Sequence, residues 1–389
     1  MDINIENRLL NYTVLVLVSI GIVFVYSSSS VYAYKQFGSS EYFLYKHLLY
    51  VGIGIILMSI LSQMDYVILK RHPYLIISVC ILLVLLVYFP KIGVMKNGAK
   101  RWLNLGFVTF QPSELLKYGF VIYLSYLISK SQERISSFKS GFLPGLFVML
   151  IIAIILLKQP DFGTTVLLFF TFLSLYFVAG TRLSYILGFI IAAIPIVYFI
   201  ITRSAYKKAR IFAFLNPELY KNTIGYQVYE SLISLGSGGL FGQGLGMSKQ
   251  KMLYLPAAHT DFILAIIGEE TGFVGVTILI LLFLIFIFTG FRIALKARDL
   301  FGVYLGFAIT IMFAYQVLIN AAVVMSLLPT KGLTLPFISY GGSSVVFSLA
   351  GVGILNSIHA NSNIASEDSD SLKSEVGLII DKMMKKGKI

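Results

Sequence analysis

One acidic residue, Asp261, lies where an ionisable group is unusual. It ends a long polar loop and is followed directly by an apolar segment of the kind that enters a membrane. Charge at the edge of the hydrocarbon is unfavourable and is usually paired, so this position favours a functional role. A structural role fits as well, because the helix dipole stabilises a carboxylate in the first turn of a helix and Thr260 is a suitable N-cap.

The pKa of Asp261 bears on the chemistry open to it. A general base works best when its pKa lies near the working pH. The dipole at a helix N-terminus lowers the pKa of a carboxylate, whereas burial raises it. We therefore expect burial beside the hydrocarbon to offset the dipole if Asp261 removes a proton.

Four further ionisable residues lie beside turns or at the starts of apolar segments. Arg101 suits an anionic headgroup or substrate, and Lys117 suits a phosphate group. Lys117 also lies three residues after Glu114, so the two share a helical face and a simple ion pair is the alternative. Asp161 follows Pro160 and fits a turn or an N-cap as well as a shared polar site.

The composition identifies a membrane protein. Hydrophobic residues make up 57% of the 389 residues and charged residues only 13%, which is far from the balance of a soluble domain. At about 20 residues per span, the apolar segments predicted to cross the membrane are 10–30, 46–63, 73–90, 113–130, 142–158, 163–181, 183–202, 262–291, 301–328 and 335–358. We therefore predict an all-α polytopic membrane protein with about ten transmembrane helices. Its transmembrane domain covers residues 1–358, a large extracytoplasmic loop at about 203–261 lies between helices seven and eight, and a cytoplasmic tail covers 359–389.

Several other kinds of site are excluded. Cys80 is the only cysteine and the four histidines are scattered, so we expect neither a disulfide framework nor a zinc centre. The glycine-dense segment 236–246 does not match a phosphate-binding loop. It favours flexible backbone against a ligand, or a re-entrant hairpin buried in protein.

Loop parity predicts one shared polar site. With the long 203–261 loop set aside, lysine and arginine are more frequent on the side of the N-terminus, which places both termini in the cytoplasm. The loops after spans three, five, seven and nine then share the outer face, and these loops carry the polar motifs. The polar residues inside the spans lie toward the same face; they are Lys117, Glu269, Glu270, Gln316 and Asn320.

The segment after Asp261 also holds two carboxylates between two glycines. Gly268 and Gly272 predict a face on which another helix packs closely. Glu269 and Glu270 are adjacent, so they point to different sides of a helix. We expect at most one of them to face the polar cavity and the other to be a structural hydrogen-bonding partner.

Five separated segments closely resemble the SEDS family (shape, elongation, division, sporulation), over span one to residue 358. The stretch at 244–250 and the basic run at 329–334 resemble the division type more than the elongation type. The segments that carry the family resemblance are Asn97 to Trp102, Gln111 to Glu114, Gln159 to Thr164, Leu255 to Phe262 and Leu328 to Ser344.

The resemblance implies a peptidoglycan glycosyltransferase that polymerises lipid II on the outer face of the cytoplasmic membrane during cell division. The donor is a glycan strand on undecaprenyl pyrophosphate, and the acceptor is the 4-hydroxyl of lipid II, with inversion to a β-1,4 bond. The implied partners are a class B penicillin-binding transpeptidase, other division proteins and membrane lipid, with no nucleic acid. A lipid II flippase, and a non-catalytic scaffold for the transpeptidase, are the alternatives.

The resemblance also implies roles for individual residues. Asp261 is the catalytic base or, alternatively, a metal ligand together with Glu114, for a divalent cation such as Mg²⁺ or Mn²⁺. Pyrophosphate binding falls to Lys117, Arg101 and Arg210. The remaining candidate substrate-binding residues are Glu114, Asp161, His259, Thr260, Lys331 and Ser339.

The polar tail after His359 has two parts. Its first part is acidic and is expected to be disordered. Its second part, from Leu372, has apolar residues at helical spacing with lysines between them. A short helix on the anionic inner leaflet, a disordered tail and a docking peptide for a division protein all fit this pattern.

Overall fold

The structure is a computed structural model that describes residues 4–89, 92–96, 99–104, 106, 109–203, 205–330 and 332–362. Three predictions therefore fall outside the described residues. They concern Lys331 as a substrate-binding residue, the part of the 97–102 motif formed by Asn97 and Gly98, and the tail from residue 363 onward.

Helices dominate the described residues. Those that coincide with the ten predicted spans are α1 (Asn4–Phe37), α2 (Tyr42–Gln63), α4 (Pro73–Leu86), α5 (Pro112–Lys130), α6 (Leu143–Lys158), α7 (Phe162–Val178), α8 (Leu183–Thr202), α11 (Ile263–Leu295), α12 (Leu300–Val324) and α13 (Gly342–Ser362). The shorter helices are α3 (Val67–Arg71), η1 (Gln132–Arg134), η2 (Phe138–Phe142), α9 (Ala205–Leu215) and α10 (Tyr226–Ser237).

The helices confirm the all-α membrane class. In the described part of the chain, 6 helices are long and apolar enough to cross a membrane, namely those within 5–37, 42–63, 138–158, 263–295, 300–324 and 342–362. Shorter apolar helices cover 73–86, 162–178 and 183–196. The number of membrane crossings stays a prediction.

The start of α13 differs from the predicted span 335–358, because the helix begins only at Gly342. Pro336 lacks a backbone N–H and biases Leu335 toward an extended conformation. Phe337 has a φ of 66°, and the hydroxyl of Ser339 accepts the Leu335 N–H. These features keep 335–341 as a loop, although its residues are largely apolar and buried.

A small antiparallel sheet, which the sequence did not predict, lies between α4 and α5. Its strands β1 (Gly93–Lys96), β2 (Ala99–Asn104) and β3 (Thr109–Phe110) are in the order β1-β2-β3. Trp102 pairs with Val94 across β1 and β2. The sheet fixes the backbone of Arg101, which lies on the central strand.

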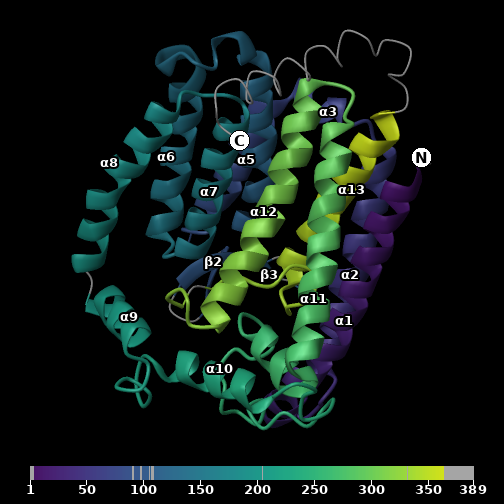
Figure 1. The fold of residues 1–389 in the computed structure, drawn as a ribbon, viewed down its shortest axis with the longest axis vertical. Helices are drawn as coiled ribbons and strands as arrows, with labels where there is room; N and C mark the ends of the chain where they lie inside the picture. Colours follow the sequence, from purple (N-terminus) through teal and green to yellow (C-terminus); the bar gives the residue numbers. More distant parts are fainter. Residues whose placement is uncertain are drawn as a thin grey trace.

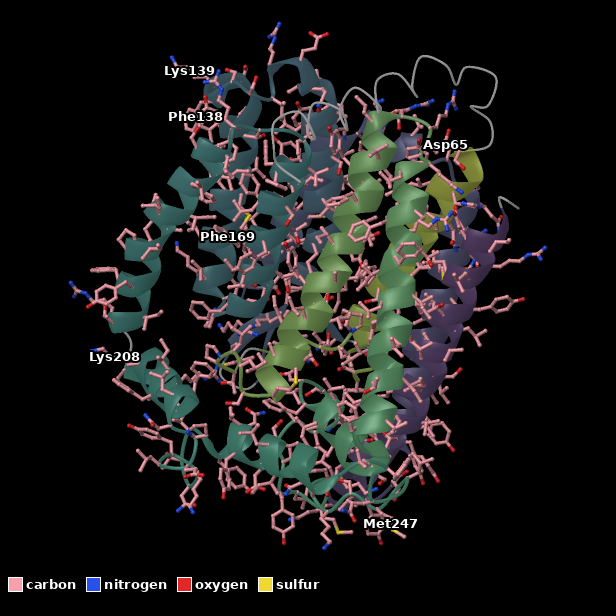
Figure 2. The ribbon with its side chains drawn as sticks, in the orientation of Figure 1. Asp65, Phe138, Lys139, Phe169, Lys208 and Met247 are labelled. Atoms are coloured by element: carbon pink, nitrogen blue, oxygen red, sulfur yellow. The ribbon has the colours of Figure 1, made fainter. Side chains whose placement is uncertain are left out.

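The helices form a bundle with two distinct ends (Figure 1). The start of α1, the end of α13 and α3 lie at one end, whereas α9 and α10 lie across the other. We call the second the α10 end. Figure 2 shows Asp65 and Lys139 at the first end and Met247 at the α10 end. Close approach of α2 and α13 depends on glycine, because a Cβ on Gly353 would lie 2.6 Å from the carbonyl oxygen of Met58.

The helix α11 bends sharply at Gly272, so the predicted span 262–291 is not one straight helix. Gly272 has a φ of 67° and a ψ of −166°, a backbone region that glycine alone occupies readily. A Cβ on Gly268 would lie 3.5 Å from Val276, although eight residues along a straight helix rise about 12 Å. The predicted packing face is therefore wrong for Gly272, which forms the bend, while Gly268 packs on Leu235 of α10.

The glycine-dense segment 236–246 stabilises this bend. The N–H groups of Phe273 and Val274, which begin the second half of α11, donate to the carbonyls of Gly239 and Leu240 at 2.9 and 3.1 Å. The carbonyls of Glu269 and Glu270, which end the first half, accept from Gln243 and Gly244. Because helix ends leave such groups unpaired, the segment satisfies both sides of the break. The segment is largely exposed, with Leu240 and Phe241 64% and 80% exposed, so the predicted hairpin buried in protein is wrong, although its backbone packs against the break in α11.

Candidate active site

Asp261 lies in the turn that precedes α11, and its backbone is fixed from α12. The side-chain amide of Asn320 donates to the carbonyl of Asp261 at 2.9 Å and to that of Leu333 at 2.7 Å. Gly332 is next to the carboxylate, since a Cβ there would lie 3.2 Å from Oδ2. The hydroxyl of Thr260 donates to the carbonyl of Ala257, and no side chain caps α11. The alternative role of Thr260 as an N-cap is therefore wrong.

The electrostatic surroundings of Asp261 suit proton transfer. Burial raises its pKa to about 6, Arg101 and Arg210 lower it, and Asp161 raises it. Burial has the largest effect, so the carboxylate is less acidic than an exposed aspartate. A base with this pKa is mostly ionised at neutral pH and still accepts a proton readily.

Arg101 connects the small sheet to the turn between α6 and α7. Its Nε donates to the carbonyl of Gln159 at 2.9 Å, and its Nη2 donates to the carbonyl of Pro160. Its Nη1 lies 4.0 Å from Oδ1 of Asp161. The guanidinium therefore spans two loops that the sequence placed on one face.

Asp161 has both of the roles considered for it. Its Oδ1 accepts the N–H of Thr164 and so caps α7. Its Oδ2 is buried and forms no hydrogen bond among the described residues. Since buried polar atoms are nearly always paired, this oxygen is a position where a bound hydroxyl or cationic group would be stabilised.

Arg210 comes from α9 in the long loop. Its Nη1 donates to the carbonyl of Thr330 at 3.2 Å, two residues from Gly332. Arg210 also lowers the pKa of Asp261, as stated above. The structure therefore brings Arg101, Asp161 and Arg210 together around Asp261.

Lys117 and Glu114 form an ion pair below this cluster. Lys117 Nζ lies 2.7 Å from Glu114 Oε2 and donates to Oε1 of Gln316 at 3.3 Å. Lys117 is 1% exposed and Glu114 6%. The ion pair, which was the alternative to phosphate binding, is therefore present. Gln316 also donates to the carbonyl of Thr334, so the pair is joined indirectly to the segment beside Asp261.

Glu114, one of the two predicted metal ligands, already has a cationic partner in the protein. Glu114 is paired with Lys117, and the described residues contain no group of three or more His, Cys, Asp or Glu that could hold a metal ion. A requirement for Mg²⁺ or Mn²⁺ stays a prediction, and no chemical step is derived through it.

His259 and Ser339 have structural contacts. The imidazole of His259 lies 5.5 Å from the ring of Tyr32 and 4.8 Å from that of Phe43, measured between centroids. Burial lowers its pKa to about 4, so it is neutral at physiological pH and is not a cation for phosphate. The carbonyl of His259 accepts the N–H of Tyr340, and Ser339 is 1% exposed and binds Leu335. His259 therefore holds the loop before α13 against the loop that ends at Asp261, whereas Ser339 stabilises the loop before α13 from within.

Sequence reasoning did not assign Asn320 or Gln316 to the site, although it placed both near the same face. Their spacing of four residues on one helix was the available signal, because residues four apart share a face. Gly332 was part of a motif but had no individual role. Its contribution is the close approach of its backbone to Asp261.

Comparison with known proteins decides the family. The model of the cell cycle protein family that comprises FtsW, RodA and SpoVE matches residues 7–364. The chain belongs to this family. It is accordingly an integral membrane protein, and the SEDS resemblance expected from the motifs is confirmed.

The similar relatives support the division type. A protein of Trichlorobacter lovleyi named probable peptidoglycan glycosyltransferase FtsW is 46% identical over 352 residues, which cover 90% of this chain and 92% of the relative. The rod shape determining protein RodA of Thermus thermophilus, known from a crystal structure, is 27% identical in sequence to this chain. The two structures superpose with a TM-score of 0.66, and the match covers 90% of this chain and 95% of RodA. The higher identity to FtsW confirms the prediction that the chain is FtsW-like rather than RodA-like.

A second solved structure bears on the fold. It is described as the structural coordination of polymerization and crosslinking by a peptidoglycan synthase complex. The matching chain is 27% identical in sequence to this one and superposes with a TM-score of 0.75. The match covers 90% of this chain and 96% of the other. The helical bundle described above is therefore the fold of this family.

Proposed function

We propose that this protein is a peptidoglycan glycosyltransferase that polymerises lipid II into β-1,4 glycan strands during division. The family, the names of the similar relatives and the site around Asp261 support this function. The single observation that carries the mechanism is a half-buried carboxylate with a pKa of about 6 close to two arginines. An inverting transfer needs these groups, namely a base for the acceptor and cations for the leaving group.

In the proposed reaction, the carboxylate of Asp261 removes the proton of the acceptor 4-hydroxyl as that oxygen attacks the anomeric carbon of the donor strand. The bond from this carbon to undecaprenyl pyrophosphate breaks, and the electron pair leaves with the pyrophosphate. Arg101 and Arg210 are positioned to stabilise the resulting negative charge. Attack from the face opposite the leaving group inverts the donor carbon and gives the β bond.

The proposed partner is a class B penicillin-binding transpeptidase that crosslinks the new strand. The solved synthase complex, which coordinates polymerization with crosslinking, supports this proposal. Further proposals are that the α10 end faces outward, that both termini are cytoplasmic, and that the protein acts at the division septum with other division proteins. The orientation rests on the loop charges described above.

The test is polymerisation by the purified protein with its cognate transpeptidase, fluorescent lipid II and Mg²⁺. Wild type is expected to produce a glycan ladder, and Asp261→Asn is expected to produce none. Absence of polymer from wild type, together with movement of lipid II across liposomes, would show that the protein is a flippase. A full ladder from Asp261→Asn would exclude Asp261 as the base, and no ladder from either protein while the complex supports crosslinking would favour the scaffold role.

A further inference from the structure

A buried ion pair connects the two ends of the segment that carries Asp261. Lys251 Nζ lies 3.0 Å from Glu270 Oε1, and the two side chains are only 6% and 0% exposed. Ser27 of α1 donates its hydroxyl to both oxygens of Glu270, at 2.7 and 2.9 Å. Lys251 also donates to the hydroxyl of Ser27 and to the carbonyl of Gly246. The network joins α1, the 246–251 segment and the part of α11 before the bend.

The neighbouring carboxylate, Glu269, binds the same segment from the other side. It accepts the backbone N–H of Lys249 at 2.9 Å and that of Gln250 at 3.4 Å. The hydroxyls of Ser248 and Ser234 also donate to it. Both carboxylates before Gly272 are thus bound by residues 248–251, which agrees with the expectation that at most one of them faces the polar cavity. We call Ser27, Lys251, Glu269 and Glu270 the clasp.

The clasp fixes the chain on both sides of Asp261. Lys251 lies ten residues before Asp261 and Glu270 lies nine residues after it. Fixing both ends of a segment lowers its conformational entropy. Between the two ends, Ala258 and Phe262 are buried, with 5% and 2% exposed. The carboxylate at the middle of the segment is therefore held from both directions.

We propose that Lys251, Glu269 and Glu270 are positioning residues that set the place of the Asp261 carboxylate. This inference rests on the proposed function of Asp261 as the base. A buried ion pair adds little stability compared with apolar residues of the same shape, but breaking it leaves a buried charge unpaired. The two carboxylates accept hydrogen bonds from specific groups of residues 248–251, so this segment can bind them in only one alignment. Apolar side chains of the same size would not select one alignment.

The first arm of the test measures kinetics. Lys251→Met and Glu270→Gln are expected to lower kcat by about 100-fold, because a displacement of about 1 Å in a catalytic group has an effect of that size. KM for lipid II stays close to wild type, since no substrate-binding residue is removed. Lys251→Arg keeps the ion pair and is expected to restore most of kcat. Lys70→Met is the matched control, because it removes the ion pair with Asp299 at the opposite end of the bundle.

The second arm measures position without activity. In a Cys80→Ala background, Ala258→Cys places a single buried thiol three residues before Asp261. Labelling by a water-soluble maleimide is expected to be slow in this protein and severalfold faster after adding Lys251→Met or Glu270→Gln. Lys70→Met leaves the rate unchanged. Thermal unfolding in detergent, followed in the same samples, gives the folded fraction of each variant.

The two arms separate the clasp from the proposed function. Unchanged labelling and unchanged kcat in Lys251→Met overturn the positioning role, as does a loss of kcat that merely follows the folded fraction. Polymerisation by Asp261→Asn would instead refute the base assignment, and the labelling arm would then still report whether the clasp holds the segment.

Discussion

Asn320 holds Asp261 by its backbone, through a hydrogen bond of 2.9 Å from the side-chain amide to the carbonyl. The same amide binds the carbonyl of Leu333 at 2.7 Å. One side chain of α12 therefore fixes two loops that are far apart in sequence. The turn that carries Asp261 and the segment at Leu333 are thus joined through a single amide.

Replacing Asn320 with leucine is expected to lower kcat for lipid II polymerisation by about 100-fold, because both loops lose their shared donor and Asp261 moves. Two buried carbonyls also lose a partner, which lowers the free energy of unfolding by roughly 1–3 kcal/mol each. Glycan ladder assays and thermal unfolding in detergent measure the two effects. Asn356→Leu is the control, because Asn356 binds Asn11 far from the site. Equal activity losses in both variants would contradict the positioning role of Asn320.

The acid limb of the pH profile is expected to report the ionisation of Asp261. The base must be unprotonated, so kcat/KM should fall as the pH drops below about 6, the pKa of this carboxyl group. Arg101→Gln and Arg210→Gln each remove a charge that lowers the pKa, so the midpoint moves to higher pH. Asp161→Asn removes a charge that raises the pKa, so the midpoint moves to lower pH.

These shifts have opposite signs, which makes the assignment testable even where absolute rates fall. Residual activity in each variant is measured from pH 5 to 9 at constant ionic strength, with lipid II well below KM. Arg134→Gln, at the other end of the bundle, is expected to leave the midpoint in place. A midpoint that does not move in any variant would assign the acid limb to a group other than Asp261.

The sequence predicted the helices and the grouping of the polar loops because both depend on local patterns. Arg101 and Asp161 follow from loop parity, and Asp261 from its place at a membrane boundary. The contacts of Asn320 and the clasp depend on tertiary packing; the sequence shows that Gln316 and Asn320 share a helical face, but not which groups they bind. The bend at Gly272 was missed because a single glycine is tolerated inside a helical pattern, and hydropathy does not distinguish a bent helix from a straight one.

The ion pair of Lys117 with Glu114 gives a prediction about stability. Lys117→Met or Glu114→Gln leaves one buried charge without its partner, which is expected to lower the free energy of unfolding by about 3–5 kcal/mol. The double variant removes both charges and is expected to recover most of this loss. Thermal midpoints in detergent measure the change. A double variant less stable than either single variant would show that the pair is not the main partner of each charge.

The stable double variant also tests whether the Lys117–Glu114 pair takes part in catalysis. Loss of polymerisation at normal stability would assign the pair a role in the reaction, whereas normal polymerisation would leave both residues structural. Its near-complete burial in the ion pair favours the structural role. Donor and acceptor use are compared by supplying a preformed glycan strand with lipid II.

Gly272→Ala is expected to prevent folding of the bend in α11. Its φ and ψ lie in a region where other residues are strained by about 1–3 kcal/mol. A Cβ there would also overlap the backbone nitrogen of Gly242 and the carbonyl of Leu240, neither of which is a flexible side-chain end. Gly188→Ala is the matched control, since a Cβ at this position in α8 meets nothing within 4 Å, and alanine is favoured over glycine inside a helix. Size-exclusion profiles and thermal midpoints should show aggregation for Gly272→Ala and wild-type behaviour for Gly188→Ala. If both variants unfold at the same temperature, position 272 does not require glycine, and the bend in α11 is absent from the folded protein.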